Sequence, residues 1–71
     1  MQKMTGWQKV FETDAAIRAE IVKGVLEEKG ITAIVLNKKE SVYQIHGSYQ
    51  VMVSSSETLQ AINIINNEIT F

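Results

Sequence analysis

The chain has 71 residues and a formal net charge of −1 at pH 7, and it contains neither cysteine nor proline. This length fits one domain, residues 1–71, near the lower limit at which a single core is stable without a metal ion or a second subunit. The lack of cysteine excludes disulfides, thiolate metal sites and cysteine nucleophiles, and a near-zero charge does not suit a nucleic-acid-binding surface. No signal peptide or membrane span is recognisable, so we expect a cytoplasmic protein.

The first predicted element is a strand over residues 7–12, because WQKVFE alternates bulky and polar residues and contains valine and aromatics. Successive side chains of a strand point to opposite faces. The two faces predicted here are Trp7, Lys9 and Phe11 on one side and Gln8, Val10 and Glu12 on the other. Both faces would carry apolar bulk.

A helix is predicted next, because the apolar residues change to a helical period. Thr13 or Asp14 would cap its start, and Gly30 would end it in the left-handed conformation. Gly24 costs such a helix about 1 kcal/mol relative to alanine, so we expect a close backbone approach there. The predicted buried stripe is Ala15, Ala19, Val22 and Leu26, widened by Ile17, Ile21 and Val25.

Two more strands and a second helix complete the pattern. The strands are residues 31–37 and 48–54, and Ser54 with Glu57 has the spacing of a capping box that would begin the helix. The helix is predicted to fray near Asn66 and Asn67, and the last residues would form a short fourth strand or a loose end. The predicted buried stripe of this second helix is Thr58, Ile62, Ile65 and Ile69 beside Leu59.

This order of elements predicts an α+β domain of the ferredoxin-like type, βαββα with an optional last strand. We expect an antiparallel or mixed sheet with both helices on one face. A right-handed crossover predicts that the first and third strands are adjacent and parallel.

The sequence also resembles the small bacterial family of putative prokaryotic signal-transducing proteins, a domain of unknown function. The resemblance covers nearly the whole chain and is most specific in AEIVKGVLEEKGI (19–31), in LNKK (36–39) and in the valine-rich strand that enters the second helix. It implies a ferredoxin-like fold related in outline to PII-type signalling proteins, and it implies no catalytic residue. One departure is Ser54, where we expect a proline at the helix entry.

The connection between the second and third strands, residues 37–48, is the candidate ligand site. Adjacent lysines at a strand end, with turn residues and hydroxyls nearby, suit a phosphate or carboxylate, and in PII-type proteins this connection is the functional loop. The alternative is a solvated turn whose lysines prevent edge pairing. The candidate residues are Asn37, Lys38, Lys39, Tyr43 and His46.

The second candidate surface is the sheet face that two helices on one side would leave uncovered. We expect Trp7, Phe11 and Tyr49 to contribute to a homo-oligomer interface, most simply that of a dimer. Arg18 falls inside the apolar arc of the first helix, so it would either extend past the core to water or pair with a partner subunit.

These features favour a small binding or signalling module that recognises an anionic metabolite or a protein partner through residues 37–48. We expect no metal, cofactor, membrane or nucleic acid to be involved, and the residues identify no catalytic set. The alternatives are a small enzyme of unknown reaction and an accessory subunit of a larger complex.

Overall fold

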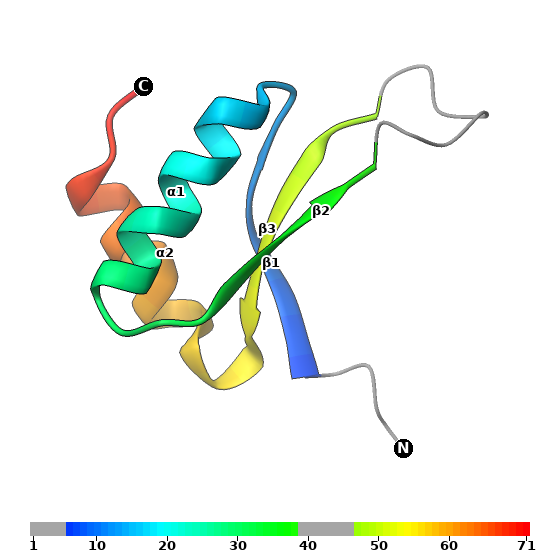
Figure 1. The fold of residues 1–71 in the computed structure, drawn as a ribbon. Coiled ribbons are helices and arrows are strands. Elements are labelled where there is room, and N and C mark those ends of the chain that lie inside the picture. The colour runs from blue at the N-terminus through cyan, green and yellow to red at the C-terminus, as the bar shows by residue number, and fades with distance from the viewer. Residues whose placement is uncertain (1–5, 39–46) are drawn as a thin grey trace.

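The computed structural model describes residues 6–38 and 47–71, which form one layer of strands and one layer of helices (Figure 1). The elements follow the predicted order. They are the strand β1 (Trp7–Thr13), the helix α1 (Ala16–Glu28), the strands β2 (Ala33–Asn37) and β3 (Tyr49–Ser54), a 3-10 turn η2 (Ser55–Glu57) and the helix α2 (Thr58–Glu68). This arrangement confirms the predicted α+β class and is that of a ferredoxin-like fold.

The sheet has the order β1-β3-β2, and β3 runs antiparallel to both of its neighbours. The prediction that β1 and β3 are adjacent is therefore correct, and the prediction that they are parallel is wrong. The crossover through α1 makes β1 parallel to β2, and β3 is then inserted between these two strands in the opposite direction. Residues 69–71 form no strand.

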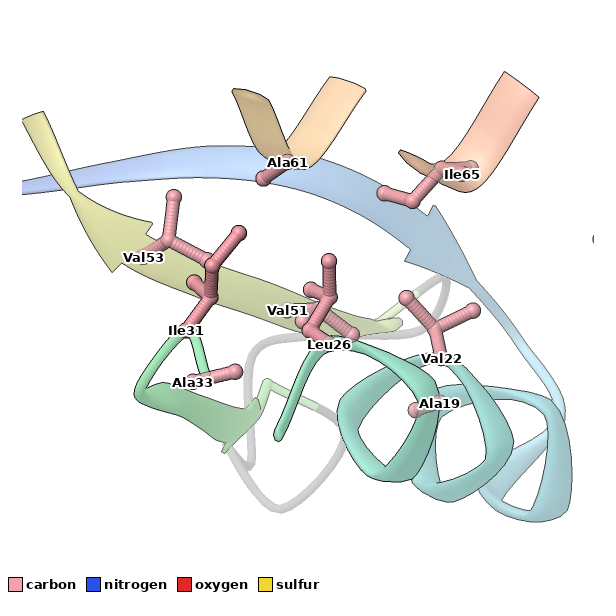
Figure 2. Close-up of a cluster of buried hydrophobic side chains, with 9 residues drawn as sticks. All are labelled: Ala19, Val22, Leu26, Ile31, Ala33, Val51, Val53, Ala61 and Ile65. Carbon is pink, nitrogen blue, oxygen red and sulfur yellow. The ribbon is translucent and has the colours of Figure 1, made fainter. Parts of the chain in front are cut away.

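Both helices cover the same face of the sheet and enclose the core. Figure 2 shows side chains from α1, α2 and the strands converging in one cluster. α1 packs on all three strands, whereas α2 packs on β1 and β3. The buried members are Ala19, Val22, Leu26, Ile31, Ala33, Val51, Val53, Ala61 and Ile65.

The end of α1 follows the glycine signal in the sequence. Gly30 has φ +88°, its N–H donates to the carbonyl of Glu27, and the N–H of Ile31 donates to the carbonyl of Leu26. These two bonds and the packing of Ile31 with Leu26 form a Schellman motif. At the other end, the Thr13 hydroxyl accepts from the N–H of Ala15 before the helix begins, so neither predicted cap bonds to the helix itself.

Gly24 lies on the exposed side of α1, and a β-carbon added there would meet nothing within 4 Å. The predicted close approach at this position is therefore wrong. Ile17 and Ile21 are also exposed, because they point away from the face that carries Ala19 and Val22. The buried stripe of α1 is thus narrower than its apolar sequence suggests.

The second helix differs from its prediction at both ends. The Ser54 hydroxyl accepts from the N–H of Ser56 and so begins the turn η2 rather than a capping box with Glu57. α2 then continues to Glu68, past the asparagines at which fraying was expected. Its buried residues are Ala61 and Ile65, flanked by Ile64 and Ile69, whereas Leu59 and Ile62 are exposed.

A β-bulge in β1 reverses the predicted facing of its second half. Lys9 pairs with Met52, but Phe11 pairs with Val51, so Val10 is the additional residue. Phe11 therefore joins Val10 on the helix-covered face. Glu12 joins Lys9 on the opposite face, which carries no helix and is called the open face below. The regular alternation assumed from the sequence fails at this point because a bulge places two residues opposite one.

Candidate binding surfaces

The face of the sheet opposite the helices is a mixed apolar and charged surface. The register aligns Trp7 with Ser54, Lys9 with Met52 and Ile34, and Glu12 with Gln50 and Leu36. These residues alternate with the buried Val51 and Val53, so their side chains lie on the uncovered side. Here β2 contributes aliphatic residues, and β1 contributes a tryptophan and a pair of opposite charges.

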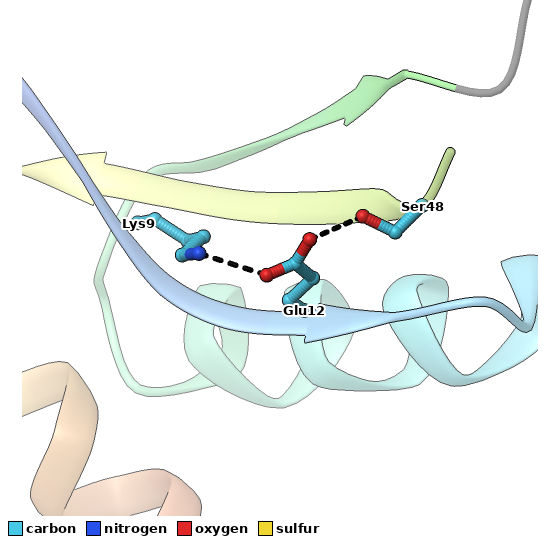
Figure 3. A network of polar contacts seen from close by, with 3 residues as sticks. All are labelled: Lys9, Glu12 and Ser48. Atoms are coloured by element: carbon cyan, nitrogen blue, oxygen red, sulfur yellow. Dashed lines mark hydrogen bonds and ion pairs between the residues drawn. The ribbon is translucent and has the colours of Figure 1, made fainter. Parts of the chain in front are cut away.

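The charged part of this open face is a network centred on Glu12 (Figure 3). The Lys9 ammonium donates to Glu12 Oε1 at 2.8 Å, and the Ser48 hydroxyl donates to Glu12 Oε2. The hydrogen bond from Lys9 is the main reason that the pKa of Glu12 is lowered from 4.5 to about 2, and the bond from Ser48 adds to it. Because both donors favour the ionised form, Glu12 stays negatively charged at neutral pH.

The base of the 37–48 connection is fixed by a backbone contact. The N–H of Lys38 donates to the carbonyl of Ser48 at 2.9 Å. Asn37 pairs with Tyr49 in the strands, and both Asn37 and Lys38 are exposed. Of the predicted ligand residues, the structure places these two at the same end of the sheet as Glu12, while Lys39, Tyr43 and His46 lie outside the described residues.

The three predicted interface residues occupy different environments. Trp7 is 43% exposed and lies on the open face. Phe11 and Tyr49 are partly buried and pack against the core from the helix-covered side. Only Trp7 is therefore in the position that the sequence suggested for an interface residue.

Arg18 interacts with an aromatic ring of its own chain. Its guanidinium carbon lies 5.0 Å from the centre of the Phe71 ring, which is in turn 5.9 Å from the ring of Phe11. Of the two readings of Arg18, this position agrees with an extended side chain at the edge of the core. The contact also attaches the C-terminal residues to the region between α1 and β1.

The sequence analysis missed Glu12 and Ser48 as members of a polar site. They are 36 positions apart in the chain, and they meet only because the bulge turns Glu12 to the open face. The one local signal is Lys9, three residues before Glu12, and in a regular strand that spacing places two side chains on opposite faces. No pattern within β1 indicates the bulge.

Two further kinds of feature, a metal-binding cluster and a membrane-spanning helix, are not found among the described residues. Among residues 6–38 and 47–71, no three histidines or acidic residues gather in a way that would hold a metal ion. Neither helix within these ranges has the length and apolar character needed to cross a membrane.

The described residues form a small ferredoxin-like α+β domain whose open face carries both apolar and charged side chains. The chain belongs to the family described as putative prokaryotic signal transducing protein, which matches residues 7–68. No curated protein and no solved structure matches the chain. The family assignment agrees with the resemblance seen in the sequence.

Proposed function

We propose that this protein is a cytoplasmic signal-transducing module of one domain, residues 1–71, that works as a homo-oligomer and binds an anionic metabolite through the 37–48 connection. The family description supports a role in signalling. A domain of this kind passes on a signal by binding one molecule and changing its contact with another. The two surfaces described above suit these two tasks.

The observation that carries the ligand proposal is the position of Lys38. Its backbone is fixed by the bond to Ser48, and its side chain is exposed at the end of the sheet. The nearby carboxylate of Glu12 is already bound by Lys9, and Lys38 forms no ion pair with any residue that the structure describes. Its positive charge is therefore exposed to solvent at the end of the sheet, where it would attract a phosphate or a carboxylate.

A thermal-shift screen against nucleotides, phosphorylated metabolites and amino acids tests this proposal. A ligand that binds only the folded state raises the melting temperature in proportion to the logarithm of its concentration over its dissociation constant. We expect an anionic compound to stabilise the wild type and the variant Lys38→Ala/Lys39→Ala to lose this response.

The matched control is Lys23→Ala/Lys29→Ala, which removes the same charge from α1 and from the residue that follows it, outside the connection. This control should keep the full ligand response. Equal responses from both double variants would contradict a site at residues 37–48. A response that depends on Trp7 but not on these lysines would transfer the binding role to the open face.

A further inference from the structure

The strand β1 is an edge strand of the sheet that the described residues form. Among the described residues β1 pairs only with β3, and no other backbone hydrogen bond reaches it. An unpaired edge is a template for another strand, and proteins commonly protect such edges with a bulge or a lysine. β1 contains both, at Val10 and Lys9. Most strands that approached this edge would therefore fit it poorly.

A second copy of β1 fits the bulge. The order in which side chains lie on the helix-covered side and on the open side is the same when β1 is read from either end. Gln8 and Thr13 pair with Val53 and Tyr49 and so lie on the helix-covered side, while Lys9 and Glu12 lie on the open side. Val10 and Phe11 stand in the middle and both lie on the helix-covered side. The pattern is therefore symmetric about the point between Val10 and Phe11.

We infer that two copies of this chain pair through β1, antiparallel and about a two-fold axis between Val10 and Phe11, to form one continuous sheet. In this register Gln8 lies opposite Thr13, Lys9 opposite Glu12 and Val10 opposite Phe11 of the second copy. Every opposed pair then shares a face, as an antiparallel ladder requires. The inference rests on the proposed homo-oligomer and names its interface.

Charge selects the same register. Lys9 of each copy lies opposite Glu12 of the other, so two ion pairs across the axis would join the internal pair of each copy, which is 2.8 Å long. Registers that place Lys9 opposite Lys9, or Glu12 opposite Glu12, bring like charges together, which is unfavourable between strands. Lys9 thus disfavours pairing with other strands, but it forms a favourable contact when the partner strand is β1 of a second copy.

The helix layer supplies apolar surface at the same edge. α2 packs over β1 and β3, and Figure 2 shows Ala61 and Ile65 on the side of α2 that faces the core cluster. The Lys29–Glu68 ion pair marks the flank of α2 that faces α1. By helical spacing Ile62 falls on the other flank, with Leu59 further toward the outer side of α2, and these side chains are 37% and 78% exposed. A two-fold axis at β1 brings these flanks of the two copies toward each other.

This second layer matters for the size of the interface. A specific interface buries roughly 800 Å² on each partner, about one-sixth of the 4834 Å² accessible surface of this chain. The edge of one strand provides only part of that area. Contact between the two α2 flanks would add apolar burial, which non-obligate interfaces concentrate at their centre.

Charge-reversal variants of the full chain test the register. Lys9→Glu should place acidic side chains opposite one another, Glu12→Lys should place basic ones, and each variant should dimerise about tenfold or more weakly than the wild type in analytical ultracentrifugation. Equal amounts of the two single variants, when mixed, should form a heterodimer, because every opposed pair is then complementary. If the variants weakened the dimer only by breaking the ion pair within each copy, mixing them would not restore dimerisation. The control pair is Lys29→Glu and Glu68→Lys, which should leave dimerisation unchanged.

A second pair of variants tests the helix layer and does not depend on how the charge variants fold. Ile62→Glu should weaken the dimer, whereas Ile17→Glu, on the outer side of α1, should not. A wild-type dimer that is indifferent to Ile62→Glu and to charge reversal would overturn this interface and leave the homo-oligomer in place. A folded wild-type monomer at micromolar concentration would overturn both and leave the anion site of the 37–48 connection unaffected.

Discussion

Lys9 and Glu12 are three residues apart in one strand, yet their side chains meet on the same face of the sheet with 2.8 Å between Nζ and Oε1. A regular strand would direct them to opposite faces, and the bulge at Val10 removes that difference. The same bulge turns Phe11 toward the core. One additional residue in the ladder thus produces both a charged pair on the open face and an aromatic side chain beneath the helices.

The first prediction concerns acid stability. Hydrogen bonds from Lys9 and Ser48 lower the pKa of Glu12 from 4.5 to about 2 in the folded state. Because the folded pKa is below the unfolded one, ionised Glu12 stabilises the fold above pH 4.5, and this contribution is lost as the pH falls from 4.5 toward 2. We expect Glu12→Gln to lose less stability than the wild type over this range in urea unfolding experiments.

The salt dependence of this effect provides its control. Glu12 and Lys9 are both about half exposed, so high salt should screen their interaction and reduce the difference between the wild type and Glu12→Gln. Ser48→Ala should have a smaller effect than Glu12→Gln, since it removes the second contact only. Identical acid unfolding of the wild type and Glu12→Gln would contradict the network shown in Figure 3.

The second prediction compares Gly24, which lies within α1, with Gly30, which follows it. Gly24 is helical, exposed and without neighbours that a methyl group would meet, so Gly24→Ala should raise the free energy of unfolding by about 0.5–1 kcal/mol. Gly30 has a positive φ, and Gly30→Ala should lower it by about 1 kcal/mol or more. Chemical denaturation measures both changes, and effects of the same sign would contradict this account.

The sequence signals that predicted structure well are those that act locally. Gly30 follows the last apolar residue of a helical stripe, so the Schellman motif and the turn into Ile31 could be predicted. The stripe Ala19, Val22 and Leu26 is likewise a local pattern, and its residues are buried. These features need no knowledge of the partner element.

Features that depend on distant partners were not predictable in the same way. The bulge at Val10 arises from how β1 matches β3, and nothing in WQKVFET marks it. The exposure of Leu59 and Ile62 follows from the position of α2 over β1, which an apolar stripe does not specify. The exposed position of Lys38 at the end of a strand could be predicted from the sequence, whereas the meeting of Glu12 and Ser48 could not.

The third prediction compares two leucines in different helices. Leu26 is fully buried and Leu59 is 78% exposed. Leu26→Ala should destabilise the protein by about 2–5 kcal/mol, from lost burial and the cavity left behind, which is enough to unfold much of so small a domain. Leu59→Ala should change the stability of the isolated domain by about 0.5 kcal/mol or less. Circular dichroism during thermal unfolding distinguishes these outcomes, and similar losses for both variants would mean that the face of α2 is assigned wrongly.

The last prediction concerns the C-terminal residues. The Phe71 ring contacts both the guanidinium of Arg18 and the ring of Phe11, and these contacts hold the segment after α2 against α1 and β1. Removing the ring in Phe71→Ala should lower the free energy of unfolding by about 1–2 kcal/mol, the sum of one aromatic pair and one cation–π contact. Phe71→Leu should recover part of this loss, because it restores apolar cover over Phe11.

A double-mutant cycle isolates the contribution of the cation–π contact. Arg18→Met keeps the unbranched apolar part of the side chain and removes the charged guanidinium, so it should cost about 0.5–1 kcal/mol in the wild type and nearly nothing in Phe71→Ala. Urea unfolding of the four proteins gives the coupling energy directly. Because Phe71 is 54% exposed, the coupling should stay at the lower end of this range. A coupling of zero would mean that Arg18 does not hold the C-terminal segment, and that the packing of Phe71 on Phe11 alone fixes its position.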